Sequence, residues 1–271
     1  MTTSSPRVNP RNMVNSLAKG LRVLEAFSAE RPEMTLSEVA RAAGLDPGTT
    51  FRMLNTLNAF DYVERVEGTK SFRLGLRVTD LGFHAIARMD LRDVARPILR
   101  RLVNDVSEAA SLGVLDHADI LYVERVRAGV TRLGVDIRIG TTIPAYCSTI
   151  GLSILAFSTR EVVDSVLAQK PRSQHRPQHD LSTADVEAML KQVRKLGYAS
   201  GESLISSGLR ILAAPVLDED GIAMAAISVA APSFHASEEE FIGRSLEPLQ
   251  HAAGQIARAL RANGMAASNV A

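Results

Sequence analysis

The sequence is short of cysteine and of long apolar runs, and both absences limit what the protein can be. Cys147 is the only cysteine among 271 residues, so no disulfide can form within the chain, and we expect a reducing compartment. No apolar run reaches membrane-spanning length, and residues 1–15 lack the apolar core of a signal peptide. We therefore expect a cytoplasmic protein with no membrane partner.

The motifs of common enzyme classes are also missing. The chain contains no G-x-S-x-G nucleophile turn, no G-x-x-x-x-G-K-[ST] phosphate loop and no G-x-G-x-x-G dinucleotide fingerprint. His175 and His179 have the spacing of a helical zinc pair, but Pro177 opposes a helix, which favours a solvated loop. We expect no catalytic residue, no metal and no cofactor.

Charge of the two signs is nearly balanced. The chain has 31 Lys and Arg residues against 30 Asp and Glu residues, a net charge of +1, which excludes a polybasic coat protein for nucleic acid. Residues 76–106 hold six arginines and four aspartates, a stretch that suits either a position near phosphate or a solvated helix face. The length fits two domains, and a hydrophobic content of 46% is ordinary for a globular protein.

The segment from Thr35 to Gly75 has the pattern of a helix-turn-helix followed by a β wing. A Thr35–Glu38 capping box predicts the start of the first helix, and Gly44 predicts its end. Asp46 as N-cap and Pro47 at the first helical position predict the second helix. Apolar positions predict a buried face on these two helices and on a preceding one: Leu17, Leu21, Leu24 and Phe27; Leu36, Val39, Ala40 and Ala43; Phe51, Leu54 and Leu57.

The other face of the second helix is expected to carry short hydroxyls and one guanidinium. Such side chains hydrogen-bond phosphates or base edges when a helix enters the major groove. Residues 62–66 and 71–74 are predicted strands, and the turn between them places Lys70 at the tip of the wing. The predicted DNA-contacting residues are Thr35, Pro47, Gly48, Thr49, Thr50, Arg52, Met53, Thr56 and Lys70.

Beyond the wing, residues 76–106 are predicted to form two helices joined near Met89 to Leu91, because Pro97 interrupts the pattern. We expect the apolar stripe from Leu91 to Val106 to be the place where subunits or domains meet. The remaining chain alternates strands and helices, which predicts an α+β fold with an antiparallel sheet. The strands are expected at 120–126, 133–139, 210–217 and 222–230, and the helices at 149–157, 160–168, 183–196 and 238–263.

Short motifs follow one another in a fixed order along the chain. They are Gly44-Leu45, Thr49, Arg52, Leu54, Thr56-Leu57, Tyr62-Val63, Arg73-Leu74-Gly75, Gly140 to Ala145, Gly197-Tyr198-Ala199, Gly208-Leu209-Arg210, Ala213 to Val216 and Ala226 to Val229. Together these motifs resemble the IclR (isocitrate lyase regulator) family of bacterial transcription factors. The resemblance runs from Val14 to Leu260, and the segment Val14 to Leu21 is similar to the branch that regulates aromatic-acid catabolism.

The resemblance implies an N-terminal winged helix-turn-helix joined by a helical linker to a GAF-like effector-binding domain that takes a small organic acid. It implies a dimer or tetramer on double-stranded, palindromic operator DNA, with RNA polymerase as a further partner. The expected parts are a flexible arm at 1–14, the DNA-binding domain at 15–75, the linker at 76–106, the effector-binding domain at 107–263 and a flexible tail at 264–271.

In the family, the effector lies between the sheet and a helix start that corresponds here to residues 148–151. Backbone amides at a helix N-terminus suit a carboxylate. Carried over by position, the expected effector-binding residues are Val135, Ile137, Thr149, Ile150, Gly201, Glu202, Ile211, Ser228 and Ala230.

The chain departs from the family pattern at three of its pocket positions. Leu204, Ile211 and Ala230 replace polar residues, which favours a less polar ligand than glyoxylate or pyruvate, although Ile211 and Ala230 fit a core position equally well. A hydroxylated monoacid is favoured over a diacid, because Glu202 in the pocket would repel a second carboxylate. Two other readings stay open: a ligand-binding adaptor that acts through protein contacts, and a small-molecule enzyme.

Overall fold

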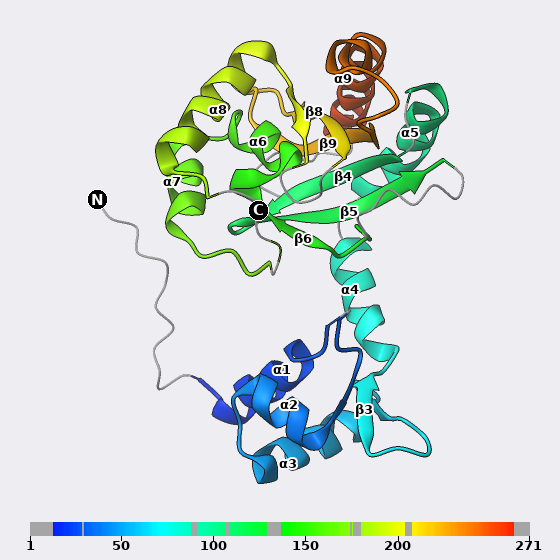
Figure 1. Cartoon of the computed structure of the whole chain (residues 1–271), viewed down its shortest axis with the longest axis vertical. Helices are drawn as coiled ribbons and strands as arrows, with labels where there is room; N and C mark the ends of the chain where they lie inside the picture. The colour runs from blue at the N-terminus through cyan, green and yellow to red at the C-terminus, as the bar shows by residue number, and fades with distance from the viewer. Residues whose placement is uncertain are drawn as a thin grey trace. The chain divides into compact units, whose positions relative to one another are not determined.

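The structure, a computed structural model, describes residues 13–28, 30–87, 91–106, 109–128, 137–173, 175, 180–203 and 208–262. The chain divides into two compact units, Met1–Ala85 and Ile86–Ala271 (Figure 1). Each unit has its own sheet and its own apolar core.

The first unit is a helix-turn-helix with a small antiparallel sheet in the strand order β1-β3-β2. Helix α4 (Arg77–Ala87) follows it and crosses into the second unit. The elements of the first unit are α1 (Asn15–Glu25), β1 (Glu33–Thr35), α2 (Leu36–Ala43), α3 (Pro47–Ala59), β2 (Val63–Arg65) and β3 (Ser71–Leu74).

Local hydrogen bonds fix the boundaries of α2 and α3 as the sequence predicted. The backbone N–H of Thr35 donates to Glu38 Oε2 at 2.8 Å, and Gly44 ends α2 in the left-handed region at φ 62°. Asp46 Oδ1 accepts from the N–H of Thr49 at 2.8 Å at the start of α3, next to Pro47. The two helices and the turn between them are confirmed.

The core of the first unit differs in part from the predicted one. Val23 is the buried residue of α1 and Phe27 is buried just after the helix ends, whereas Leu17 is 63% exposed and Leu21 is 50% exposed. Phe51, expected in the core, is 44% exposed on α3. The reason is the orientation of each helix about its axis, because an apolar stripe wider than the contact leaves residues at its edge in solvent.

The second unit is built on a six-stranded antiparallel sheet in the order β6-β5-β4-β9-β8-β7. Its strands are β4 (Ala109–Asp116), β5 (Asp119–Arg127), β6 (Thr142–Pro144), β7 (Ala199–Glu202), β8 (Leu209–Leu217) and β9 (Ala223–Pro232). Its helices are α5 (Leu91–Val106), the 3-10 turn η2 (Ala145–Cys147), α6 (Thr149–Leu155), α7 (Arg160–Ala168), α8 (Thr183–Leu196) and α9 (Glu238–Ala262).

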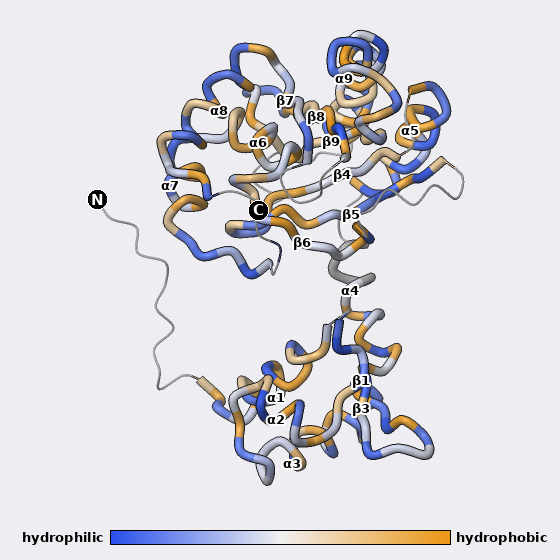
Figure 2. The backbone as a smooth tube through the Cα atoms, viewed as in Figure 1, coloured by the Kyte–Doolittle hydropathy of each residue, from blue (hydrophilic) through white to orange (hydrophobic). Residues whose placement is uncertain are grey.

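Two layers of helices enclose this sheet. Helices α5 and α9 pack on one face through Leu99, Leu249 and Ile256, against strand residues such as Leu212 and Ile227. Helix α6 covers the other face, and α7 and α8 pack outside it. Hydrophilic and apolar residues alternate along α8 and α9 (Figure 2), as expected for helices with one face toward the core.

The structure corrects two sequence predictions in this unit and confirms another. The stripe expected as a subunit or domain contact is core, because Leu91, Leu99 and Leu102 are buried against the sheet and α9. The prediction of two helices joined near Met89 to Leu91 is confirmed, since α4 ends at Ala87 and α5 begins at Leu91, although Pro97 lies inside α5. The part of the predicted strand 133–139 that is described, residues 137–139, is not a strand and leads into a turn.

Candidate functional site

The exposed face of α3 is the first candidate site. Its N-terminal residues Pro47 and Gly48 and, further along, Arg52 and Thr56 are exposed. The Arg52 side chain makes no hydrogen bond or ion pair with any described residue, so its guanidinium donors are available to DNA. Asn55 lies on the same face, one turn after Arg52, and its exposed amide is a donor and acceptor that the sequence reading missed.

Two threonines expected on this face are buried. Thr50 has no exposed surface, and its hydroxyl donates to the Asp46 carbonyl at 2.9 Å. Thr49 is 7% exposed, and its N–H is bound to Asp46 Oδ1. At about 100° per residue, position 50 turns with Leu54 toward the core. The prediction that both hydroxyls face solvent is wrong.

Two further residues that were predicted to contact DNA, Thr35 and Met53, have side chains that interact within the protein. Thr35 is half-buried in the capping box of α2, and Met53 is partly buried against the core of the unit. The Thr56 hydroxyl donates to the Arg52 carbonyl at 2.9 Å, which leaves its oxygen lone pairs as acceptors. Arg52, Asn55 and the exposed start of α3 therefore carry most of the polar surface suited to DNA.

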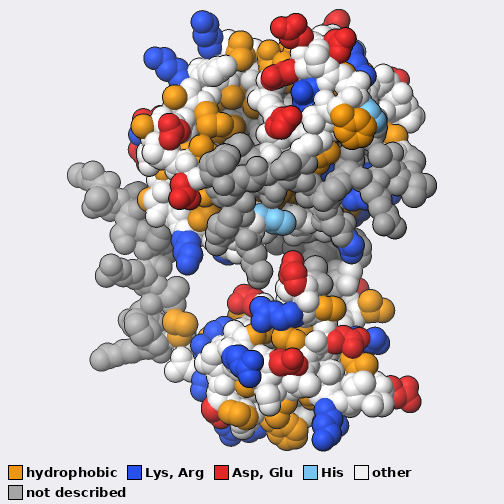
Figure 3. Space-filling view, viewed as in Figure 1, with side chains coloured by type: hydrophobic (Ala, Val, Ile, Leu, Met, Phe, Trp, Pro, Cys, Tyr) orange, Lys and Arg blue, Asp and Glu red, His pale blue; other side chains and the backbone are white. Residues whose placement is uncertain are grey.

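The wing presents a second cationic surface in the same unit. Strands β2 and β3 are joined by a turn in which Gly68 has φ 74°, and Lys70 is exposed at its end without a partner among the described residues. Arg73 pairs across the strands with Glu64 at 3.0 Å. Lys and Arg side chains are interspersed with Asp and Glu on the surface of this unit (Figure 3). Among the described wing residues, Lys70 and Arg65 have no carboxylate partner, and Arg65 lies over the Phe72 ring at 5.4 Å, so Lys70 is the wing cation left without a contact.

The second candidate site is the face of the six-stranded sheet that α6 covers. Strand pairing aligns Ser111, Ser228 and Ala213 in one row across β4, β9 and β8. The next row aligns Ala230 with Ile211. Residues 226 and 213 belong to the core cluster under α6, and since strand residues alternate between faces, these rows lie on that face. Their side chains are short apart from Ile211.

Arg125 extends this row with a charge that the sequence reading missed. It lies opposite Ser111 on β5, and its NH1 donates to Ser111 Oγ at 3.0 Å. Tyr122 is nearby on the same strand, where burial raises the pKa of its phenol to about 12 against an opposing effect of Arg125. The face under α6 therefore holds a guanidinium, a phenol and two serine hydroxyls.

The start of α6 covers part of this face. Ile150 is buried, and a Cβ on Gly113 would lie 2.9 Å from Ile150 Cγ2, so α6 approaches β4 closely there. Ser148 caps the helix by accepting from the Gly151 N–H at 3.0 Å. Thr149 is half-buried. The backbone amides of Thr149 and Ile150 precede the Gly151 amide that Ser148 caps, and Ile150 has no side-chain hydrogen-bonding group.

The remaining residues that were predicted to bind the effector do not all lie on the face under α6. Ile137 is buried in the core under α6, and Gly201 pairs with Ile211 on that side of the sheet. Glu202 is exposed and alternates to the opposite face, as does Ser200, whose hydroxyl donates to Glu238 on α9. Glu202 is therefore removed from the expected site. Val135 lies outside the described residues.

In the part of the chain that the structure describes, no group of three or more His, Cys, Asp or Glu residues is placed to hold a metal ion. His175 is described and His179 is not. Within the described ranges, no helix is long and apolar enough to cross a membrane.

Two family models match the chain. The bacterial transcriptional regulator IclR C-terminal domain matches residues 83–258, and the IclR helix-turn-helix domain matches residues 16–67. The HTH-type transcriptional regulator KdgR of Escherichia coli K12 is 30% identical over 226 residues, which are 83% of this chain and 85% of KdgR. The Pca regulon regulatory protein of Pseudomonas putida is 29% identical over 224 residues, 80% of this chain and 74% of its own.

A solved structure shares the fold over most of its length. It is an IclR homolog from Microbacterium hydrocarbonoxydans complexed with 4-hydroxybenzoate, with 30% sequence identity and a TM-score of 0.74, covering 91% of this chain and 99% of that one. The predicted α+β fold and the predicted resemblance are both confirmed. The relatives are transcriptional regulators rather than enzymes. This chain belongs to the IclR family of DNA-binding bacterial transcriptional regulators.

Proposed function

We propose that the protein binds an operator through α3 and the wing, as at least a dimer, and that a hydroxylated aromatic monoacid bound under α6 controls this binding. The observation that carries the proposal is the row of Arg125, Ser111 and Ser228 on the sheet face beneath α6. A family whose C-terminal domain binds ligands and whose N-terminal domain binds DNA supplies the context.

On the DNA side, Arg52 is proposed to contact a guanine edge or a phosphate, with Asn55 beside it. A guanidinium binds guanine O6 and N7 in a bidentate way, and an amide does the same for adenine. The exposed start of α3 and Lys70 are proposed to contact phosphates, which fix orientation without reading sequence. Thr49 and Thr50 are left with a supporting role, because their hydroxyls are buried.

On the effector side, Arg125 is proposed to bind the ligand carboxylate together with the backbone amides of Thr149 and Ile150. Ser228 is proposed to bind a ligand hydroxyl from the sheet. The short side chains of the surrounding rows and the aliphatic Ile137 and Ile211 suit an aromatic ring. With Glu202 on the other face, we base the preference for a monoacid on Arg125, whose guanidinium contacts the row through Ser111, whereas Arg127 in the next row donates to the Ile137 carbonyl.

The aromatic ligand class is supported by two relatives. One solved relative is described as complexed with 4-hydroxybenzoate, and another is named a Pca regulon regulatory protein. We propose the same class here because a phenolic acid matches the chemistry of the row: a carboxylate for Arg125 and a hydroxyl for Ser228.

A selection of duplexes from a random pool tests the function directly. We expect enriched sites with two related half-sites about one helical turn apart, because each recognition helix reads only a few base pairs. We also expect 4-hydroxybenzoate to change the affinity for the enriched duplex. A ligand-binding adaptor would bind the acid and enrich no sequence, and that result would overturn the DNA-binding part of the proposal.

Assembly is proposed to use the first unit. Met13, Val14, Leu17 and Leu21 are exposed at 49%, 63%, 63% and 50%, and they share one face of α1 and the residues before it. Isolated exposed apolar residues are common, but four at helical spacing form a patch that a second copy would cover. Pairing through this unit would also place two α3 helices on one operator.

A further inference from the structure

A groove separate from the proposed effector face lies between α7 and α8, above the end of α6. Its volume is about 530 Å³, within the usual range of small-ligand sites. We refer to it as the α7–α8 groove. It is lined by Leu155, Ala156, Ser158, Arg160, Val163, Ala184, Glu187, Ala188, Leu190, Lys191 and Arg194.

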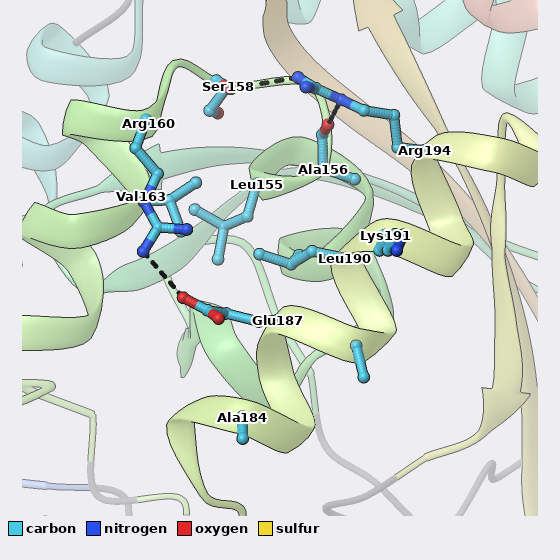
Figure 4. A pocket seen from close by; sticks show the side chains of 11 residues that line it. Leu155, Ala156, Ser158, Arg160, Val163, Ala184, Glu187, Leu190, Lys191 and Arg194 are labelled. Carbon is cyan, nitrogen blue, oxygen red and sulfur yellow. Dashed lines mark hydrogen bonds and ion pairs between the residues drawn. The ribbon is translucent and has the colours of Figure 1, made fainter.

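We propose that the α7–α8 groove binds a small organic monoanion with an apolar body. The floor of the groove supplies the apolar contact. Leu155, Val163 and Leu190 are buried in the core and present aliphatic surface to it, and Figure 4 shows Leu155 and Leu190 between the charged residues. Ala184 and Ala188 lie on α8 and line the groove, and their short side chains leave space that longer ones would fill.

One end of the groove carries a net negative charge. The Arg160 NH2 pairs with Glu187 at 2.8 Å, which joins α7 to α8 (Figure 4). The Arg160 Nε pairs with Asp164 at 2.9 Å on its own helix. With two carboxylates on one guanidinium, this end has no positive charge to offer an anion. A second carboxylate on the ligand would meet Glu187 there, so a dianion is disfavoured.

The other end of the groove carries uncompensated positive charge. Arg194 donates from Nε to the Ala156 carbonyl at 2.5 Å and from NH2 to the Ser158 carbonyl at 3.3 Å. These acceptors are neutral, so the Arg194 charge has no counterion there. Lys191, one turn earlier on α8, is exposed and makes no ion pair with any described residue.

The arrangement therefore has a cationic end, an aliphatic floor and an end with a net negative charge. A carboxylate placed near Lys191 would gain a charge-assisted hydrogen bond, and its alkyl or aryl body would cover the floor. Arg194 also caps the last carbonyls after α6, so its replacement would disturb the packing of α8. Lys191 has no such structural contact and is the better residue to change.

The groove shares no lining residue with the proposed effector row, but α6 connects the two places. Its first residues, Thr149 and Ile150, lie at the effector face, whereas Leu155 and Ala156 at its end line the groove. The two ligands would therefore contact opposite ends of one helix. The proposal does not depend on what the effector face binds.

Methyl NMR of the full chain with hexanoate as probe tests the proposal. At about 10 mM hexanoate, which would fill most of a millimolar site, we expect shifts of the Leu155, Val163 and Leu190 methyl signals. A titration with hexan-1-ol should give a dissociation constant at least about fivefold larger, because the alcohol lacks the charge. Absent shifts, or equal dissociation constants for hexanoate and hexan-1-ol, would overturn the proposal.

Variants on α8 provide matched controls. Lys191→Gln should weaken hexanoate binding about fivefold, as for an exposed ion pair, and Ala188→Trp should abolish the methyl shifts by filling the groove. Lys195→Gln removes a lysine from the same helix that does not line the groove and should bind as the parent does. Arg125→Gln should also leave the groove shifts unchanged. Equal affinity of Lys191→Gln and the parent, in spectra that show both folded, contradicts the proposal.

Discussion

Glu124 and Arg125 are consecutive on β5, yet their side chains bind on opposite faces of the sheet. Glu124 Oε2 accepts from Arg92 Nε on α5 at 3.0 Å, and its side chain is only 3% exposed. Arg125 NH1 donates to Ser111 on the face under α6. One dipeptide thus connects the helix that begins the second unit with the proposed effector row, because strand residues alternate between faces.

Removing the Arg125 charge should separate effector binding from DNA binding. Arg125→Gln is expected to weaken 4-hydroxybenzoate binding about 10- to 150-fold, since a hydrogen bond to a charged group contributes roughly 1.5–3 kcal/mol. Calorimetry measures this loss. Operator affinity without the acid should match that of the parent.

Two further variants are controls for the effect of Arg125→Gln on effector binding. Arg125→Lys keeps the charge without the planar fork and should lie between the parent and Arg125→Gln. Arg258→Gln removes an exposed arginine of α9 and should change nothing. If Arg125→Gln binds the acid as tightly as the parent does, the carboxylate is held elsewhere.

The buried position of Thr50 has a consequence for mutagenesis of α3. Thr50→Val keeps the shape but removes the hydroxyl that donates to the Asp46 carbonyl. We expect a loss of about 1 kcal/mol in the free energy of unfolding and no change in operator preference. Urea unfolding and competition between duplexes measure the two quantities. A change in preference at one base pair, with stability unaltered, would return Thr50 to the DNA surface.

Acid should weaken the start of α3 through Asp46. The hydrogen bond from the Thr49 backbone N–H holds the pKa of Asp46 below its ordinary value of 3.8. A lowered folded pKa stabilises the helix at pH values above 3.8, and this stabilisation is lost as the pH falls through the folded value. Hydrogen exchange of the first α3 amides, corrected for its intrinsic rate, measures the loss.

Asp46→Asn is the matched control for the acid effect. The amide oxygen still accepts at the N-cap, but it does not titrate in this range. Its first-turn protection should be nearly independent of pH where that of the parent falls. Parallel pH profiles for the two proteins would assign the acid effect to other groups.

The exposed face of α1 should determine the oligomeric state. Leu17→Glu combined with Leu21→Glu places two charges on the apolar face and should shift the protein to a monomer in light scattering at micromolar concentration. Leu196→Glu changes another exposed leucine, at the end of α8, and should leave the assembly unaltered. If the double variant has the same assembly mass in light scattering as the parent, the subunit interface does not include this face of α1.

Features fixed by nearby residues could be predicted from the sequence. The Thr35–Glu38 box joins residues three apart and forms as expected, and Ser237 and Glu240 make the same contacts at the start of α9. Helix α7 and helix α8 begin and end at the predicted residues. Such signals are local, so no knowledge of the tertiary fold is needed to read them.

Features fixed by packing could not be predicted in the same way. Residues 109–114 of β4 are buried on both faces and show no alternation, so the strand was missed and with it the pairing of Ser111 with Arg125. The apolar stripe from Leu91 to Val106 predicts burial, but its sequence does not distinguish a contact with another subunit from the contact with the sheet and α9 that the structure shows. Glu202 lies on the face of the sheet opposite to the expected one, because neighbouring residues of a strand, here Gly201 and Glu202, point to opposite faces.

The proposed function requires the exposed face of α3 to read an operator under the control of an acid. Fluorescence anisotropy with a duplex selected by the parent protein tests it, with and without 4-hydroxybenzoate. Arg52→Ala should bind about 1–3 kcal/mol more weakly if the contact is bidentate, whereas Arg258→Ala should match the parent. The acid should change the affinity of the parent. Unchanged affinity in a folded Arg52→Ala protein, together with no response of the parent to the acid, would contradict the proposed function.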